Sequence, residues 1–228
     1  MTARLVKLQS APDLVERVYG ALLDAIVEGS LAPGSRLTQE EIAAQLDVSR
    51  QPVLQALRLL KSDGLVLDAP GRGVIVAPLD AAGIAQIYEV RGALDALAAR
   101  LAAARRAVID ARLIEQGRRA ARGRHAKAMI DADMAFHNAI YEASGNPLLG
   151  RSAQLHWVHL RRVMGAVLQS SPQRETLWDE HEAIATAIAA GDARGAVRRI
   201  EAHAREASGK LLAGLAHTLA PSLKGTPA

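Results

Sequence analysis

The 228-residue sequence contains no cysteine and few aromatic residues, which make up 3% of the chain. The lack of cysteine excludes disulfide bonds and thiolate metal ligands. No uncharged apolar run approaches the roughly 18 residues that a membrane-spanning helix needs, and the N-terminal segment MTARLVKLQSAPDL has no apolar core of signal-peptide length. Because the hydrophobic half of the chain is mainly Ala, Leu and Val, we expect a mostly α-helical protein. The lack of cysteine, of a signal peptide and of a membrane span leads us to expect a soluble, cytoplasmic protein.

The positive charge of the chain does not mark a nucleic-acid surface. The net charge is +4, yet residues 1–75 contain 8 Lys or Arg and 9 Asp or Glu. DNA binding is therefore inferred from the sequence pattern of these residues and not from their charge.

Residues 1–78 have the pattern of three short helices and a hairpin. Apolar residues spaced by four from Leu14 to Ile26 predict the first helix, which Gly29 ends. Thr38 and Glu41 form a T-x-x-E capping box at the start of the second. Ser49 is typical of an N-cap, and it begins a third helix that runs to Gly64.

Two short apolar runs follow the third helix, at residues 65–67 and 74–76. A glycine-containing turn, residues 69–73, separates them, which predicts a β-hairpin. Three helices and a hairpin match a winged helix-turn-helix DNA-binding domain, in which the third helix enters the major groove. The alternative is a plain three-helix bundle with surface charges.

The start of the third helix has side chains that suit DNA bases. Arg50 can bond guanine and Gln51 adenine, while Ser49 and the helix N-terminus suit a phosphate. Arg72, between two glycines at the hairpin tip, suits a minor groove. Arg58 and Lys61 are candidates for contacts with the DNA backbone.

Three segments of this domain, residues 33–38 (PGSRLT), 48–53 (VSRQPV) and 60–66 (LKSDGLV), resemble the DNA-binding domain of GntR-type regulators. The resemblance spans residues 12–77 and implies operator binding. Leu54 and Glu41 stand where many members have arginine, so operator sequence or affinity is expected to differ. The DNA-contacting residues that we predict are Arg36, Thr38, Ser49, Arg50, Gln51, Pro52, Arg58, Gly71 and Arg72.

Residues 79–228 show no strand pattern and predict an all-helical bundle. Breaks at residues 145–147, 170–172 and 191–192 separate the later helices. The expected helices cover roughly residues 81–106, 108–122, 126–144, 147–170, 175–190 and 192–218.

One carboxylate and three imidazoles in this bundle suit a divalent cation. Asp133 and His137 are four residues apart and share a helix face. His181 and His203 are 22 residues apart, and antiparallel helices joined near Gly191 would place them at similar depth. Such a set suits Zn²⁺, Ni²⁺ or Mn²⁺. From the spacing alone, each histidine is better explained as an ordinary core or surface residue than as a metal ligand.

Residues 88–91 (YEVR), 144–147 (SGNP) and these four polar residues resemble the FCD effector domain of the FadR subfamily of GntR regulators, over residues 82–216. The resemblance implies that Asp133, His137, His181 and His203 hold a divalent metal ion and that the domain binds a small organic acid. Arg91 is a candidate second anchor for its carboxylate. An internal salt bridge with Asp95, one turn away, is the alternative role of Arg91.

The resemblance implies a homodimer on an inverted-repeat operator, acting as a ligand-responsive repressor and not as an enzyme. One alternative is a regulator that senses the metal itself. The other is a metal-dependent hydrolase, which lacks a convincing general base because Glu180 and Glu182 are expected to point away from His181.

Overall fold

The computed structural model describes residues 14–123, 125–168 and 175–219, which form two compact units. The first comprises the described residues up to Ile26 together with Leu31–Ala77, and the second comprises Val27–Ser30 and the described residues from Pro78 onward. Among the described helices, none has the length and apolar character to cross a membrane. The predicted fold class, a winged helix-turn-helix followed by a helical bundle, is confirmed.

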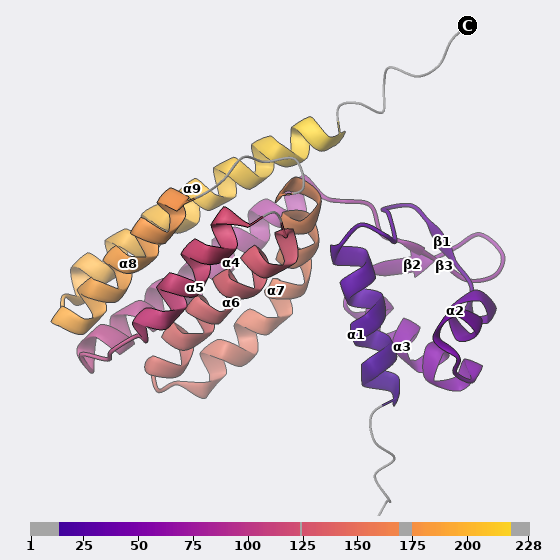
Figure 1. Ribbon diagram of the computed structural model, residues 1–228, viewed down its shortest axis with the longest axis horizontal. Coiled ribbons are helices and arrows are strands. Elements are labelled where there is room, and N and C mark those ends of the chain that lie inside the picture. Colours follow the sequence, from indigo (N-terminus) through magenta and orange to yellow (C-terminus); the bar gives the residue numbers. More distant parts are fainter. Residues whose placement is uncertain (1–13, 124, 169–174, 220–228) are drawn as a thin grey trace, which may run out of the picture. The chain divides into compact units, whose positions relative to one another are not determined.

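The first unit combines three helices with a three-stranded antiparallel sheet (Figure 1). Strand β3 lies between β1 and β2, and Ile75 pairs with Arg36 on one side and Leu67 on the other. The sequence predicted β2 and β3 as a hairpin but missed β1, because two residues have no detectable periodicity. The elements are α1 (Leu14–Val27), β1 (Arg36–Leu37), α2 (Gln39–Leu46), α3 (Arg50–Ser62), β2 (Val66–Asp68) and β3 (Val74–Val76).

Local capping interactions define both ends of α2. The Thr38 hydroxyl accepts from the Glu41 amide, and the Glu41 carboxylate accepts from the Thr38 amide, so the predicted capping box is present. Asp47 ends α2 in the left-handed conformation, with φ 51°. Ser49 occupies the N-cap of α3, but its side chain makes no capping hydrogen bond. The Ser49 hydroxyl is therefore not used by the helix that it precedes.

The tip of the hairpin requires glycine and is tied to β1. Gly73 has φ +89°, and a Cβ there would lie 2.3 Å from the carbonyl oxygen of Leu37. The Arg36 guanidinium donates to the carbonyl oxygen of Arg72 across the turn, at 2.5 Å. The β2–β3 hairpin, residues 66–76, is the wing of the domain. Strand β1 thus fixes the tip of the wing, which carries the exposed Arg72 side chain.

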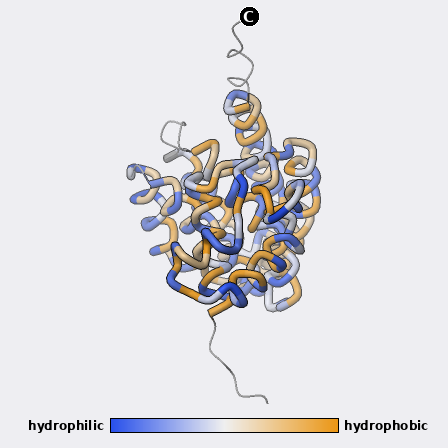
Figure 2. Tube along the Cα trace, turned by 90° about the vertical axis from the view of Figure 1, so that its right-hand side faces the viewer, coloured by the Kyte–Doolittle hydropathy of each residue, from blue (hydrophilic) through white to orange (hydrophobic). Residues whose placement is uncertain are grey.

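The second unit is built from α4 (Ala81–Ala104), α5 (Ala111–Arg122), α6 (Ala126–Ala143), α7 (Pro147–Leu168), α8 (Glu175–Ala190) and α9 (Ala193–Leu219). Helix α4 packs mainly against α9, and α6 packs against α7. Hydrophobic and hydrophilic stretches alternate along the trace, as helices with one buried face require (Figure 2). Helix α5 begins three residues later than predicted because the Asp110 side chain caps it at the Arg112 amide.

The core of this unit is continuous and contains both tryptophans of the chain. Trp157 on α7 is 0% exposed and Trp178 on α8 is 2% exposed. The Trp178 ring lies over Gly117 of α5, where a Cβ would come within about 2.0 Å of the indole. The close approach of α5 and α8 therefore depends on glycine at this position.

Candidate metal centre and DNA-binding surface

The four predicted metal ligands come together in the interior of the helical unit. Asp133 and His137 project from α6, one turn apart, while His181 comes from α8 and His203 from α9. All four side chains are buried, and one ligand atom from each lies within 4.8 Å of the others. The sequence spacing paired Asp133 with His137 and His181 with His203, and the fold brings all four into a single cluster.

The imidazole Nε2 atoms face the centre of the cluster. His181 Nε2 lies 3.3 Å from His203 Nε2 and 3.4 Å from Asp133 Oδ1. His137 Nε2 lies 4.0 Å from Asp133 Oδ1. Two ligands that each bind one cation at about 2.0–2.2 Å are separated by roughly 3.0–3.5 Å when the angle between them is 90–110°. The two spacings of His181 Nε2 fall within this range, whereas His137 Nε2 lies farther from Asp133 Oδ1.

Aromatic rings enclose the histidines. Phe136 stacks on His181 with ring centroids 4.2 Å apart, and Trp178 meets the same imidazole edge-on at 4.6 Å. Trp157 lies 5.5 Å from the His137 ring. These rings keep water from the imidazoles and hold their orientation, so the cluster is organised by packing as well as by hydrogen bonds.

Burial keeps two of the histidines neutral. Burial, followed by the charge of Arg91, lowers the pKa of His137. The pKa of His181 is well below its usual value, first because of burial and then because of His203 and His137 beside it. Only a neutral imidazole has a lone pair for a metal ion, so burial favours the form that binds cations.

Arg91 and Asp95 form a buried ion pair on α4, with Nε and Oδ2 3.3 Å apart. Burial alone would raise the pKa of the Asp95 carboxyl, but Arg91 and His137 hold it at about 2. Asp95 also accepts a hydrogen bond from the Tyr141 hydroxyl and lies 3.6 Å from His137 Nδ1. The Arg91 guanidinium rests 4.0 Å from the Trp157 ring centroid. The expected salt bridge is therefore present and borders the histidine cluster.

Glu180 makes a contact that the sequence does not indicate. Its Oε2 reaches across to α9 and lies 2.8 Å from His203 Nδ1. Glu182 turns elsewhere and pairs with Arg118 of α5 at 2.8 Å. The contact of Glu180 depends on how closely α8 and α9 pack, and the sequence carries no direct signal for that distance.

The cluster fits a resident divalent cation on the chemistry of its donors. Three nitrogens and one carboxylate oxygen are a common set for Zn²⁺ and for other first-row divalent ions. Neither ring nitrogen of His137 has a hydrogen-bond partner within the described structure, nor does His181 Nδ1. Buried polar atoms without partners are costly, and a cation would satisfy those that face the centre.

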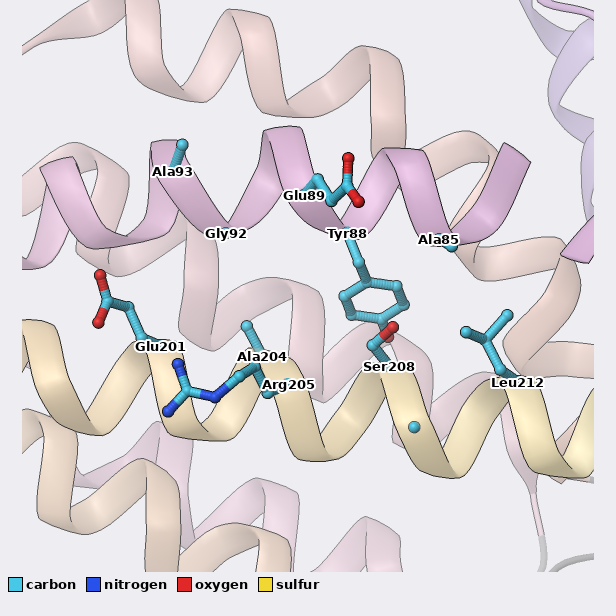
Figure 3. Close-up of a pocket in the computed structure, with 11 residues that line it drawn as sticks. Ala85, Tyr88, Glu89, Gly92, Ala93, Glu201, Ala204, Arg205, Ser208 and Leu212 are labelled. Atoms are coloured by element: carbon cyan, nitrogen blue, oxygen red, sulfur yellow. The ribbon is translucent and has the colours of Figure 1, made fainter. Parts of the chain in front are cut away.

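A separate cavity of about 610 Å³ lies between α4 and α9 (Figure 3). The Tyr88 ring points from α4 toward Ser208 of α9, and small residues such as Gly92 and Ala204 leave the space between the helices open. None of the four clustered ligands lines the cavity. Tyr88 lines the cavity and also lies near the histidine cluster, because its ring centroid is 5.8 Å from the guanidinium of Arg91, which borders that cluster.

The predicted DNA-contacting residues lie at two places on the first unit. Ser49, Arg50, Gln51 and Arg58 are exposed at the start and along one side of α3, whereas Pro52 is buried. Arg36, Gly71 and Arg72 are exposed at the wing, with Thr38 half-buried beside β1. Arg50 pairs with Glu40 of α2 at 3.1 Å, and both side chains are largely exposed. An exposed ion pair of this kind is weak, so Arg50 can readily exchange Glu40 for another anion.

A winged helix-turn-helix joined to a helical unit is the architecture expected of a DNA-binding transcription regulator. Residues 14–76 match the gntR family of bacterial regulatory proteins, and residues 86–206 match the FCD domain. The chain therefore belongs to the GntR family, among the members that carry an FCD domain.

Relatives along most of the chain are also regulators. A transcriptional regulator from an unstable DNA locus of Streptomyces ambofaciens is 30% identical over 82% of this chain and 80% of its own length. LutR of Bacillus subtilis is 33% identical over 78% of this chain and 92% of its own. A protein named for the regulation of an L-lactate dehydrogenase operon in Escherichia coli K12 is 33% identical, covering 84% and 82%. The prediction of a regulator and not an enzyme is confirmed.

Solved structures support the same fold. A GntR regulator from Rhodococcus sp. RHA1 has a TM-score of 0.71 at 26% identity, covering 87% of this chain and 97% of its own. McbR/YncC of Escherichia coli has a TM-score of 0.74 at 22% identity, with the same two coverages. The likeness to McbR/YncC establishes shared architecture only.

Proposed function

We propose that this protein is a ligand-responsive repressor whose helical unit binds a divalent cation and a small organic acid. The observation that carries the proposal is the buried cluster of Asp133, His137, His181 and His203. A Zn²⁺, Ni²⁺ or Mn²⁺ ion held by these four residues would supply a Lewis-acidic site. Burial keeps the imidazoles of His137 and His181 neutral, and the aromatic rings around the cluster exclude water and orient the histidines.

The organic acid is proposed to bind beside Arg91. The Arg91 Nε makes no hydrogen bond in the described structure, although the Asp95 carboxylate lies 3.3 Å away. A ligand carboxylate would supply that bond, and a guanidinium favours such pairs. The relative named for an L-lactate dehydrogenase operon makes 2-hydroxy acids the first ligands to test.

On the DNA side, we propose that a homodimer places one α3 helix in each half of an inverted-repeat operator. Arg50 and Gln51 would read bases, while Ser49 and Arg58 would contact phosphates. Arg72 would enter the minor groove, with Arg36 holding the wing through the Arg72 carbonyl. The remaining predicted residues, Thr38, Pro52 and Gly71, would shape these surfaces.

The link between the two sites is an equilibrium between two arrangements of the dimer. A ligand changes operator affinity only when it binds one arrangement better than the other. Coupling of this kind commonly changes affinity 5- to 150-fold. A second candidate follows from the same cluster: the cation itself is the signal, and no organic acid is needed.

A direct test is to select operator DNA from a random duplex pool with the cation-loaded protein and then titrate 2-hydroxy acids. We expect at least a 5-fold loss of operator affinity with one acid, and no loss with an Arg91→Ala variant. Arg112→Ala, on the exposed start of α5, is the matched control. Release that follows cation concentration without any acid would support the metal-sensing alternative. Operator affinity that responds to neither the cation nor any acid would contradict both.

A further inference from the structure

Glu180 lies outside the cluster of four candidate ligands and contacts one of them, His203. Its Oε2 lies 2.8 Å from His203 Nδ1, within hydrogen-bonding distance. The His203 side chain is 4% exposed and that of Glu180 is 28% exposed, so water competes only partly for this contact. Asp95 approaches His137 Nδ1 as well, but at 3.6 Å and while engaged by Tyr141 and Arg91.

This contact determines which nitrogen of His203 carries the proton. An ionised carboxylate can only accept hydrogen bonds, so His203 Nδ1 must be the donor. In a neutral imidazole the other nitrogen then has the lone pair. That other nitrogen, Nε2, is the atom that lies 3.3 Å from His181 Nε2 at the centre of the cluster.

We propose that Glu180 is a positioning residue of the cation site, which keeps the proton of His203 on Nδ1 and leaves Nε2 free to bind a cation. The proposal rests on the cation site put forward above and extends it beyond the four ligands. Carboxylates that accept from the outer nitrogen of a ligand histidine orient the ring and increase its basicity.

His181 differs from His203 in this respect. Its Nδ1 has no hydrogen-bond partner in the part of the chain that the structure describes. Without a cation, His181 Nε2 can carry its proton and donate it to His203 Nε2. With a cation, the proton of His181 belongs on Nδ1. Glu180 therefore fixes the tautomer of one histidine, while that of the other follows occupancy of the site.

Glu182 provides a matched control on the same helix. It has the same charge as Glu180 and is two residues away, but its carboxylate pairs with Arg118 of α5 and not with a histidine. Replacing Glu182 changes the net charge of α8 equally and leaves the contact with His203 intact. Any effect that is specific to Glu180 must therefore come through the imidazole.

The test compares Co²⁺ affinity of the full chain and its variants by competition with a chelating indicator. We expect Glu180→Ala to weaken binding 10- to 100-fold, as loss of such carboxylates does in other sites. Glu180→Gln should restore most of the affinity, because its amide oxygen can accept from Nδ1–H. Glu182→Ala should match the wild type. A Glu180→Ala affinity within 2-fold of the wild type would overturn the proposal.

A second measurement does not need the cation. Nitrogen-15 NMR of histidine-labelled, metal-free protein should show His203 as the Nδ1–H tautomer in the wild type and in Glu180→Gln, but not in Glu180→Ala. An Nε2–H tautomer in the wild type would overturn the role of Glu180. If the wild type bound no cation but had the Nδ1–H tautomer, the cation site would be refuted, while tautomer control by Glu180 would remain supported.

Discussion

The Nε2 atoms of His181 and His203 lie 3.3 Å apart, although 22 residues separate the two histidines in the sequence. The turn at Gly191, with φ +78°, returns the chain so that α8 and α9 bring both rings to one depth. Two imidazole nitrogens at this distance are close enough to share one proton in a hydrogen bond or to bind one cation. The packing of α8 against α9 therefore brings together two of the four proposed cation ligands.

Replacing Arg50 should weaken and broaden operator recognition. Because an arginine that reads a guanine contributes about 1–3 kcal/mol of discrimination, Arg50→Ala should lose that amount and tolerate more bases at one position. Loss of the exposed Glu40 pair should matter little. Anisotropy titrations with single-base operator variants measure this. Equal affinity of wild type and Arg50→Ala for every variant would show that Arg50 reads no base.

Replacing Arg58 should weaken binding to all operators about equally. A phosphate contact carries no base information, and its loss should make the slope of log affinity against log salt shallower by about 1. Titrations of Arg58→Ala at several salt concentrations measure that slope. Arg112→Ala, in the helical unit, should leave it unchanged. A salt slope of Arg58→Ala identical to the wild type would rule out the phosphate contact.

Breaking the buried ion pair should destabilise the helical unit. Asp95→Ala leaves the 3%-exposed Arg91 without its counter-charge, which typically costs about 3–5 kcal/mol of unfolding free energy. The double variant Arg91→Met/Asp95→Leu should lose much less, since no uncompensated charge remains. Urea denaturation of the metal-free proteins measures both. A double variant that loses as much unfolding free energy as Asp95→Ala, or more, would show that the unpaired charge of Arg91 is not the cause of the loss.

Metal-free protein should lose stability as the pH falls below about 6.5. The folded-state pKa values of His137 and His181 are lowered by burial, so below their unfolded value the unfolded chain binds more protons than the folded chain. Each such histidine reduces the unfolding free energy by up to about 1.4 kcal/mol per pH unit. Thermal unfolding between pH 7.5 and 5.0 should show the decline, and His181→Leu should flatten it. The exposed His217→Leu control should behave as the wild type.

Tryptophan fluorescence should report on the cluster. The chain has two tryptophans; Trp157 lies 5.5 Å from the His137 ring and Trp178 lies 4.6 Å from the His181 ring. Addition of Ni²⁺ or Co²⁺ should quench the emission of both with one transition. The variants Trp157→Phe and Trp178→Phe assign the signal to each ring. Quenching that persists in His203→Ala would place the bound ion elsewhere.

Local signals in the sequence predicted much of the first unit. The capping box of Thr38 and Glu41 and the glycine at residue 73 act through neighbouring atoms, and the structure has both features. The strand β1 was missed because its two residues acquire strand geometry only by pairing with β3. The Ser49 hydroxyl does not cap α3, because residue preference indicates a position and not the direction of the side chain.

Contacts between distant helices were harder to predict. The spacing of Asp133 and His137 indicated one face of a helix, and that of His181 and His203 indicated a similar depth in paired helices. The resemblance then favoured one metal site that contains all four. Glu180 was expected to have no part in the site, since a neighbour of His181 on a helix points elsewhere. In the structure, the Glu180 side chain contacts His203 on the neighbouring helix α9. Such contacts depend on helix packing distances, which hydrophobic periodicity does not define.

The most direct test of the cation site is elemental analysis of the purified protein, together with His181→Ala and His203→Ala. The wild type is predicted to hold about one equivalent of Zn, Ni or Mn per chain, and both variants are predicted to lose it while retaining DNA binding. A wild-type protein that binds operator DNA but takes up none of these metals after incubation with each would contradict the account.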